Sequence, residues 1–247
     1  MKLYREDEGT GRPLLFVHGW GTSGRVWGAQ LPEFVRDHRV VTLDLRGCAR
    51  SPRPSQGNTI DTNVEDLAEV AGELGKPVIV GSSIGGLYAT ELASRHPELV
   101  ERVVTVGGPA YWPSTGMLDK VLELREALVT DRAGTLAGWL PNWFAPGTSS
   151  ALIDWTLRQV LDSGVYIDEL FTDCTRYDPR SRLPSLSVPI TYLHGELDAE
   201  IPLEVPLTCA ALTPGAELIV IEGSGHLPHQ ERPLAFTAAL RKVLGDN

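Results

Sequence analysis

The sequence predicts an α/β fold in which a mostly parallel β-sheet carries helices on both faces. Six short runs are apolar at consecutive positions, which is typical of strands in a parallel sheet whose two faces are both buried. The runs are 14–17, 40–43, 77–80, 103–106, 190–193 and 218–221. With 247 residues, of which 42% are hydrophobic, the chain can form one sizeable core and carry an inserted segment.

Helices are predicted between the apolar runs. Thr62 and Glu65 have the spacing of a capping box, which predicts a helix over 64–74. Gly75 then suits the end of that helix, because glycine adopts the left-handed conformation that commonly follows a helix. A proline in the first turn predicts a terminal helix over 233–244.

The interval between the fourth and fifth apolar runs is too long for a simple crossover connection and predicts an insertion. Its pattern favours helices over 116–130, 132–140 and 149–161, with breaks at prolines. We therefore expect a core built from 1–110 and 183–247, and a helical cap, or lid, over 111–182.

Aromatic residues are concentrated in this predicted cap, which holds four of the six tryptophans. Large rings on the inner face of the cap would give a substrate pocket apolar walls, although they could also form only the core of the cap. The rings expected at the pocket are Trp112, Trp139, Trp143 and Phe144.

A nucleophile is predicted where the apolar run 77–80 meets a helix. The sequence Gly-Ser-Ser-Ile-Gly at 81–85 has the G-x-S-x-G spacing of a nucleophile elbow, a tight turn that lifts a serine clear of the sheet. Glycines on both sides allow the close approach of strand and helix that this turn requires. Ser83 is the central residue and the predicted nucleophile, whereas Ser82 should point elsewhere.

Two partners for this serine follow later in the chain. Asp198 and His226 each come just after an apolar run, where the carboxyl ends of parallel strands place functional groups. The chain order Ser83, Asp198, His226 predicts a Ser-His-Asp catalytic triad. Glu200 could replace Asp198 as the acid, but the Gly-x-x-Asp spacing after the strand favours Asp198.

An oxyanion hole would need two N–H donors. The residue after the nucleophile, Ile84, should supply one, and the backbone N–H of Trp20 should supply the other from the loop that follows the first apolar run. His18 in that loop could act as a second base, but we expect its imidazole to hydrogen-bond the loop and fix its shape.

Five motifs carry a resemblance to a known family. They are His18-Gly19-Trp20-Gly21, Asp44-Leu45-Arg46-Gly47, Gly81 to Gly86, Gly195-Glu196-Leu197-Asp198 with Ile201-Pro202, and Gly225-His226 with Glu231-Arg232-Pro233. Over nearly its whole length the chain resembles the α/β-hydrolase superfamily. The form of its first motif and its small cap are similar to the pimeloyl-acyl-carrier methyl ester esterases and related small carboxylesterases.

The resemblance implies an α/β-hydrolase fold and a serine esterase that needs no cofactor. Such an enzyme cleaves carboxylic esters of small, largely apolar substrates through an acyl-enzyme. Enol-lactonases, C–C bond hydrolases and cofactor-free haloperoxidases share most of these motifs, so those reactions stay open. A ligand-binding protein that retains the triad but turns over slowly also stays open.

Charge and composition narrow the expected partners. A formal net charge of −10 argues against nucleic acid as a partner, and no apolar run is long enough to span a membrane. The predicted cap has ten acidic and seven basic residues, so we expect a small diffusible ester and consider an acidic acyl-carrier protein unfavourable.

Cysteines and histidines give no sign of a metal site or of disulfides. Cys48 and Cys174 are expected to be small core or loop residues. The pair His226-x-x-His229 has no acidic or cysteine partner near it in the sequence, so no metal is expected. Three scattered cysteines and a charged N-terminus without the apolar stretch of a signal peptide favour the cytoplasm.

Overall fold

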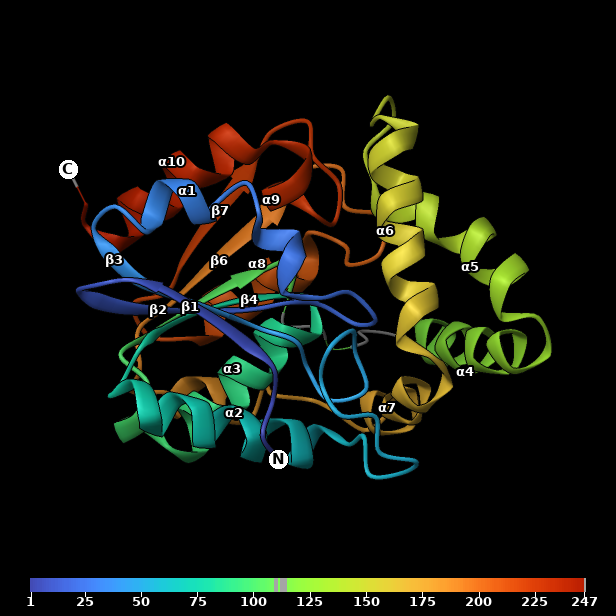
Figure 1. The fold of residues 1–247 in the computed structure, drawn as a ribbon, viewed down its shortest axis with the longest axis horizontal. Helices are drawn as coiled ribbons and strands as arrows, with labels where there is room; N and C mark the ends of the chain where they lie inside the picture. Colours follow the sequence, from blue (N-terminus) through green and yellow to red (C-terminus); the bar gives the residue numbers. More distant parts are fainter. Residues whose placement is uncertain (109–110, 112–114, 247) are drawn as a thin grey trace.

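A computed structural model describes residues 1–108, 111 and 115–246, with the backbone alone for 115–118. Its centre is a seven-stranded sheet with the strand order β1-β3-β2-β4-β5-β6-β7 (Figure 1). The strands are β1 (Arg5–Gly9), β2 (Arg12–Val17), β3 (His38–Leu43), β4 (Val78–Ser82), β5 (Arg102–Val106), β6 (Ile190–Gly195) and β7 (Glu217–Ile221). All of the described strand pairs are parallel except β1 with β3. The predicted fold class is confirmed, and each apolar run lies in a strand except for Pro77, which precedes β4.

The seventh strand, β1, was not predicted from the sequence. Its residues Arg-Glu-Asp-Glu-Gly are partly or fully exposed at the edge of the sheet. Because an edge strand pairs through its backbone on one side only, it does not need the apolar run that marks a buried strand.

Helices cover both faces of the sheet. On one face lie α2 (Ile60–Leu74), α3 (Ile84–Arg95) and α8 (Glu204–Leu212), and on the other lie α1 (Leu31–Phe34) and α10 (Pro233–Leu244). Strand β2 shows why the apolar runs do not alternate with polar residues. Leu15 and Val17 join the core under α2 and α3, whereas Leu14 and Phe16 join the core under α1 and α10.

Helix α2 begins four residues before the predicted start at residue 64. Its N-cap is Thr59, whose hydroxyl accepts from the Thr62 backbone N–H, while the Thr62 hydroxyl accepts from the Thr59 N–H, both at 3.1 Å. The predicted capping box was therefore placed wrongly, because Thr62 is the last residue of the box, at helix position N3, and not its first. Gly75 ends the helix with a φ of 73°, as predicted.

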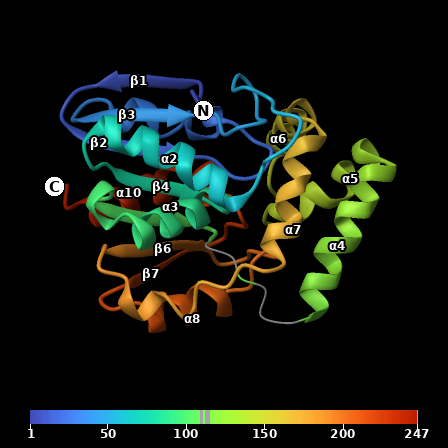
Figure 2. The ribbon, with the colours of Figure 1, turned by 90° about the horizontal axis from the view of Figure 1, so that it is seen from below.

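The chain between β5 and β6 forms α4 (Thr115–Thr130), α5 (Arg132–Trp139), α6 (Ser150–Ser163) and α7 (Leu170–Cys174). These inserted helices lie together beyond the carboxyl ends of the parallel strands (Figure 2). A short 3₁₀ helix, η3 (Leu140–Trp143), follows α5, and α9 (Pro228–Glu231) precedes α10. In the parts of the chain that the structure describes, no helix is both long and apolar enough to cross a bilayer.

Replacing Gly81 with alanine should destabilise the fold strongly. A Cβ at this position would overlap the carbonyl group of Gly85, and backbone on both sides leaves no room to adjust. We expect a loss of about 1–3 kcal/mol or more in the free energy of unfolding.

Gly72→Ala, on helix α2, is the matched control, because a Cβ there meets no atom within 4 Å. It should stabilise by about 0.5–1 kcal/mol. Denaturant unfolding measures both, and equal stabilities would contradict the close approach.

Candidate active site

Ser83 occupies a strained turn between β4 and α3. Its backbone has φ 50° and ψ −117°, and its N–H donates to the Val106 carbonyl at 2.7 Å, so the turn is tied to the end of β5. The serine side chain makes no capping bond to α3, and within the described part of the chain its hydroxyl has no hydrogen-bond partner. A Cβ at Gly85 would lie 2.6 Å from the His18 carbonyl oxygen, so the turn also depends on this glycine.

The neighbouring Ser82 differs from Ser83. Its side chain is buried, and its hydroxyl has no hydrogen-bond partner among the described residues. Ser82 also does not line the cavity that Ser83 lines. The structure therefore places only the second serine of the pair at the cavity.

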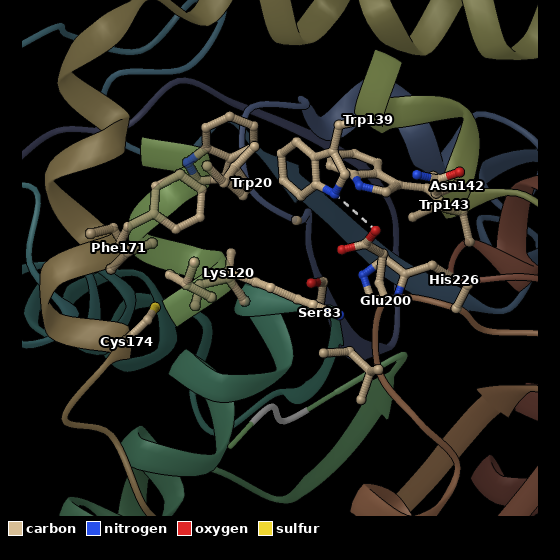
Figure 3. Close-up of a pocket in the computed structure, with 18 of the residues that line it drawn as sticks. Trp20, Ser83, Lys120, Trp139, Asn142, Trp143, Phe171, Cys174, Glu200 and His226 are labelled. Carbon is tan, nitrogen blue, oxygen red and sulfur yellow. Dashed lines mark hydrogen bonds between the residues drawn. The ribbon is translucent and has the colours of Figure 1, made fainter. Parts of the chain in front are cut away.

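A cavity of about 790 Å³ lies between the carboxyl edge of the sheet and the inserted helices. Ser83 and His226 both line it, as do Trp20 and Ile84 (Figure 3). The figure shows Phe171 and Cys174 at one end of the cavity, and Trp139, Trp143, Glu200 and His226 at the other, with Ser83 between them.

His226 and Asp198 form a buried pair. The Nδ1 atom of His226 lies 2.8 Å from Oδ2 of Asp198, and Oδ1 of Asp198 accepts the backbone N–H groups of Glu200 and Ile201 at 2.9 Å each. Burial alone would raise the pKa of Asp198, but His226 and these hydrogen bonds outweigh it and lower that pKa. Burial would likewise lower the pKa of His226, but the Asp198 carboxylate outweighs it and raises that pKa.

Glu231 holds the His226 loop in place, a role that sequence reasoning missed. Its carboxylate accepts the backbone N–H of Gly225 at 2.9 Å and that of Ala145 at 2.7 Å. The backbone N–H of His226 donates to the Trp143 carbonyl at 2.7 Å. The histidine loop is thus tied to the chain that follows η3. The sequence did contain a sign of this role, because Glu231 stands five residues after His226 in the Gly225-His226 and Glu231-Arg232-Pro233 motif.

The loop after β2 brings Trp20 to the cavity. Among the described residues, no acceptor is bonded to the Trp20 backbone N–H, and the Ile84 N–H belongs to the first turn of α3, where helix N–H groups have no partner inside the helix. His18 fixes this loop as expected, since its Nε2 accepts the Leu45 N–H at 2.8 Å and its Nδ1 lies 2.7 Å from the Gly19 carbonyl oxygen. Complete burial lowers the pKa of His18 to about 4.

The predicted aromatic residues do not all lie together. Trp139 and Trp143 line the cavity, with their rings 5.1 Å apart and nearly perpendicular. Phe144 does not line it and instead borders a second cavity, which residues 196–199 also line, so its expected place was wrong. Trp112 lies outside the described residues. Phe171 of α7, which was not predicted, does line the cavity.

The cysteines are buried, as expected for core residues. Burial raises the pKa of the Cys48 thiol to about 12 and raises that of the Cys174 thiol as well, so neither is an activated thiolate. His229 is also fully buried, with its ring stacked on Trp27 at a centroid distance of 4.2 Å.

Glu200, the alternative acid, lies at the cavity but does not bond to His226. Its Oε1 accepts the indole N–H of Trp139 at 2.8 Å (Figure 3). Burial raises its pKa, while His226 and the Trp139 hydrogen bond act to lower it. Asp198 therefore holds the position against the imidazole, and Glu200 is a second carboxyl group that faces the cavity.

The comparisons with known proteins agree with this fold. A family model described as the alpha/beta hydrolase family matches residues 14–240. The chain belongs to the alpha/beta hydrolase family. A pimeloyl-[acyl-carrier protein] methyl ester esterase from Vibrio atlanticus is 30% identical over 96% of this chain and 96% of its own.

Solved structures show the same fold over almost the whole chain. An esterase from Exiguobacterium antarcticum superposes with a TM-score of 0.92 at 25% identity, covering 99% of this chain and 96% of its own. A bromoperoxidase from Bacillus anthracis superposes with a TM-score of 0.90 at 28% identity, covering 99% and 95%. The predicted superfamily is confirmed, and these relatives support hydrolase activity.

Removing the negative charge of Glu200 should lower the pKa of His226. The carboxylates that face His226 are Asp198, Glu200 and Glu231, and each favours the protonated imidazole. Glu200→Gln should therefore lower the His226 pKa, and Asp198→Asn should lower it further. Titration of the His226 ring signals by NMR measures both shifts.

Glu196→Gln is the control for this titration. Glu196 lies on the same loop as Glu200, but it is exposed, and its carboxylate accepts the Gly223 N–H at 2.9 Å. It should leave the His226 pKa unchanged. A rise of that pKa in Glu200→Gln, or no change, would contradict the electrostatic arrangement.

Proposed function

We propose that this protein is a serine hydrolase that cleaves carboxylic esters of small, largely apolar substrates through an acyl-enzyme. One observation carries the proposal most directly. Ser83, held at a strained strand–helix turn, lines the same cavity as His226, whose Nδ1 bonds to the buried Asp198. A serine, a histidine and a buried acid in this setting match the requirements of nucleophilic catalysis.

In the proposed reaction, the Ser83 hydroxyl oxygen attacks the ester carbonyl carbon while Nε2 of His226 takes its proton. Asp198 bonds to Nδ1, so it holds the ring orientation and stabilises the imidazolium. The backbone N–H groups of Trp20 and Ile84 would hold the oxyanion. His226 then passes its proton to the leaving alcohol, and water attacks the acyl-enzyme in the same way to release the acid and Ser83.

The walls of the cavity support small and largely apolar substrates. Its volume of about 790 Å³ lies in the range of small-molecule sites. The inserted helices contribute much of the wall, through Val121 and Leu124 of α4, Trp139 of α5 and Leu170 and Phe171 of α7. We therefore propose that the segment 111–182 is a cap that sets substrate preference.

The natural substrate is proposed to be a free small ester. The name of the Vibrio atlanticus relative indicates a substrate linked to an acyl-carrier protein, so the expectation against a carrier has no support from that relative. In favour of a free ester, acidic residues outnumber basic ones in the segment 111–182. Comparing kcat/KM for a methyl ester on acyl-carrier protein and for the same ester free in solution decides between them.

Two further aspects of the function follow the same proposal. Three free cysteines favour a reducing compartment, and so a cytoplasmic location.

A lactone, a β-diketone and a halide-dependent oxidation belong in the substrate screen beside esters, because one structural relative is named a bromoperoxidase. An ester should give the highest kcat/KM among them.

Ser83→Ala should abolish ester hydrolysis, and Ser82→Ala should leave most of it. Loss of the nucleophile should lower kcat for p-nitrophenyl acetate by about 10⁴-fold or more. Ser82 is the matched control, because it is the adjacent serine, is buried and has an unbonded hydroxyl. Steady-state kinetics on both variants, with circular dichroism to verify folding, measures the difference. Reversed phenotypes would show that Ser83 is not the nucleophile.

A further inference from the structure

We propose that Glu200 and Trp139 form a polar subsite beside His226 that binds a hydrogen-bond donor, a hydroxyl or an ammonium group, in the alcohol part of the ester. The inference rests on the proposed function, because the position of the alcohol follows from the role of His226. It adds a specificity determinant to a cavity whose walls are otherwise mainly apolar.

The geometry leaves one carboxylate oxygen available for a ligand. Oε1 of Glu200 is occupied by the Trp139 indole N–H at 2.8 Å. Of the residues that the structure describes, none donates to Oε2. Figure 3 shows the carboxyl group directed into the cavity, on the same side as His226. The indole bond fixes the orientation of the carboxyl group, so its second oxygen is held ready for a donor.

The electrostatic setting also favours a donor at this place. No described lysine or arginine forms an ion pair with Glu200, although the side chain is partly buried. A partly buried carboxyl group with a single hydrogen bond has lost hydration that the protein does not replace, and a donor from the substrate would restore it. The net charge of −10 further favours a cationic ligand over an anionic one.

The position of Glu200 indicates which part of the ester it meets. His226 passes a proton to the leaving alcohol in the proposed reaction, so the alcohol lies against the imidazole. Glu200 and Trp139 occupy that end of the cavity, whereas Phe171 and Cys174 occupy the opposite end (Figure 3). The acyl chain is therefore assigned to the Phe171 end, and the donor-bearing alcohol to the Glu200 end.

Glu200 could instead act only through His226, whose protonated form it stabilises, or only by holding Trp139. These roles differ from a subsite in one measurable respect. A role through His226 changes kcat/KM for every ester by the same factor. A subsite changes the ratio between an ester that carries a donor and an ester of the same shape that lacks one.

The test uses two matched pairs of butanoate esters. The hydroxyethyl ester is compared with the propyl ester, and the dimethylaminoethyl ester with the isopentyl ester, which has the same shape without the charge. In the wild-type protein we expect the ratio of kcat/KM to favour the hydroxyl about fivefold and the ammonium about tenfold. Glu200→Leu should bring both ratios close to one.

Two further variants separate charge from hydrogen bonding. Glu200→Gln retains the shape, but its one carbonyl oxygen takes the bond from the Trp139 indole N–H, so an NH2 group replaces the free carboxylate oxygen. A substrate hydroxyl can accept from this NH2 group and an ammonium group cannot, so the variant should keep most of the hydroxyl preference and lose the ammonium preference. Trp139→Phe removes the indole N–H and leaves a smaller aromatic ring, which frees the carboxyl group to move, so both ratios should fall partway. Because Gln is nearly isosteric with Glu, the Glu200→Gln variant is informative even if Glu200→Leu folds poorly.

A binding measurement keeps this inference separate from the proposed function. Titration of Ser83→Ala with the four esters, followed by tryptophan fluorescence, reports binding without turnover. If the wild-type protein hydrolyses none of the esters, the proposed function fails. The subsite would still be supported if the donor-bearing esters bind more tightly than their matched esters and if Glu200→Leu abolishes that difference in affinity. Equal ratios and equal affinities with and without the Glu200 carboxyl group would overturn it.

Discussion

The turn at Ser83 is the constraint on which the rest of the site depends. A serine with φ 50° is costly, and the surrounding backbone must hold it in place. The fold does so by direct backbone contact. A Cβ at Gly81 would overlap Gly85, and a Cβ at Gly85 would overlap the carbonyl oxygens of Val17 and His18. The Ser83 N–H is also bonded to the end of β5. The free hydroxyl at the edge of the sheet is a consequence of this packing.

Asp198 and His226 lie on loops that are held by their own hydrogen bonds. Asp198 is held by two backbone N–H groups of its own loop, and His226 is held by Asp198 and by a loop that Glu231 ties to the chain after η3. The inserted helices therefore do more than cover the cavity. Through the carbonyl of Trp143 and the indole of Trp139 they contact the loops that carry His226 and Asp198, which couples the shape of the cavity to the positions of these two residues.

Patterns that depend on burial or on chain order were predictable from the sequence. The central strands show as apolar runs because both faces are covered, and the placement of Ser83, Asp198 and His226 follows from where parallel strands end. Features that depend on packing were not predictable. The edge strand β1 has no apolar signal, and Phe144 follows Trp143 directly yet borders a different cavity. Glu200 was visible only as a rival to Asp198, because its bond to Trp139 joins residues 61 positions apart.

Labelling with a fluorophosphonate tests the central claim most directly, because the reagent reacts with an activated serine and not with an ordinary hydroxyl. Peptide mass spectrometry of the folded protein after reaction locates the adduct. The account predicts one adduct per chain, on Ser83, and no labelling once the protein is unfolded. An adduct on Ser82 or elsewhere, or a folded protein that does not react, would contradict the view that the strained turn and the His226–Asp198 pair activate Ser83.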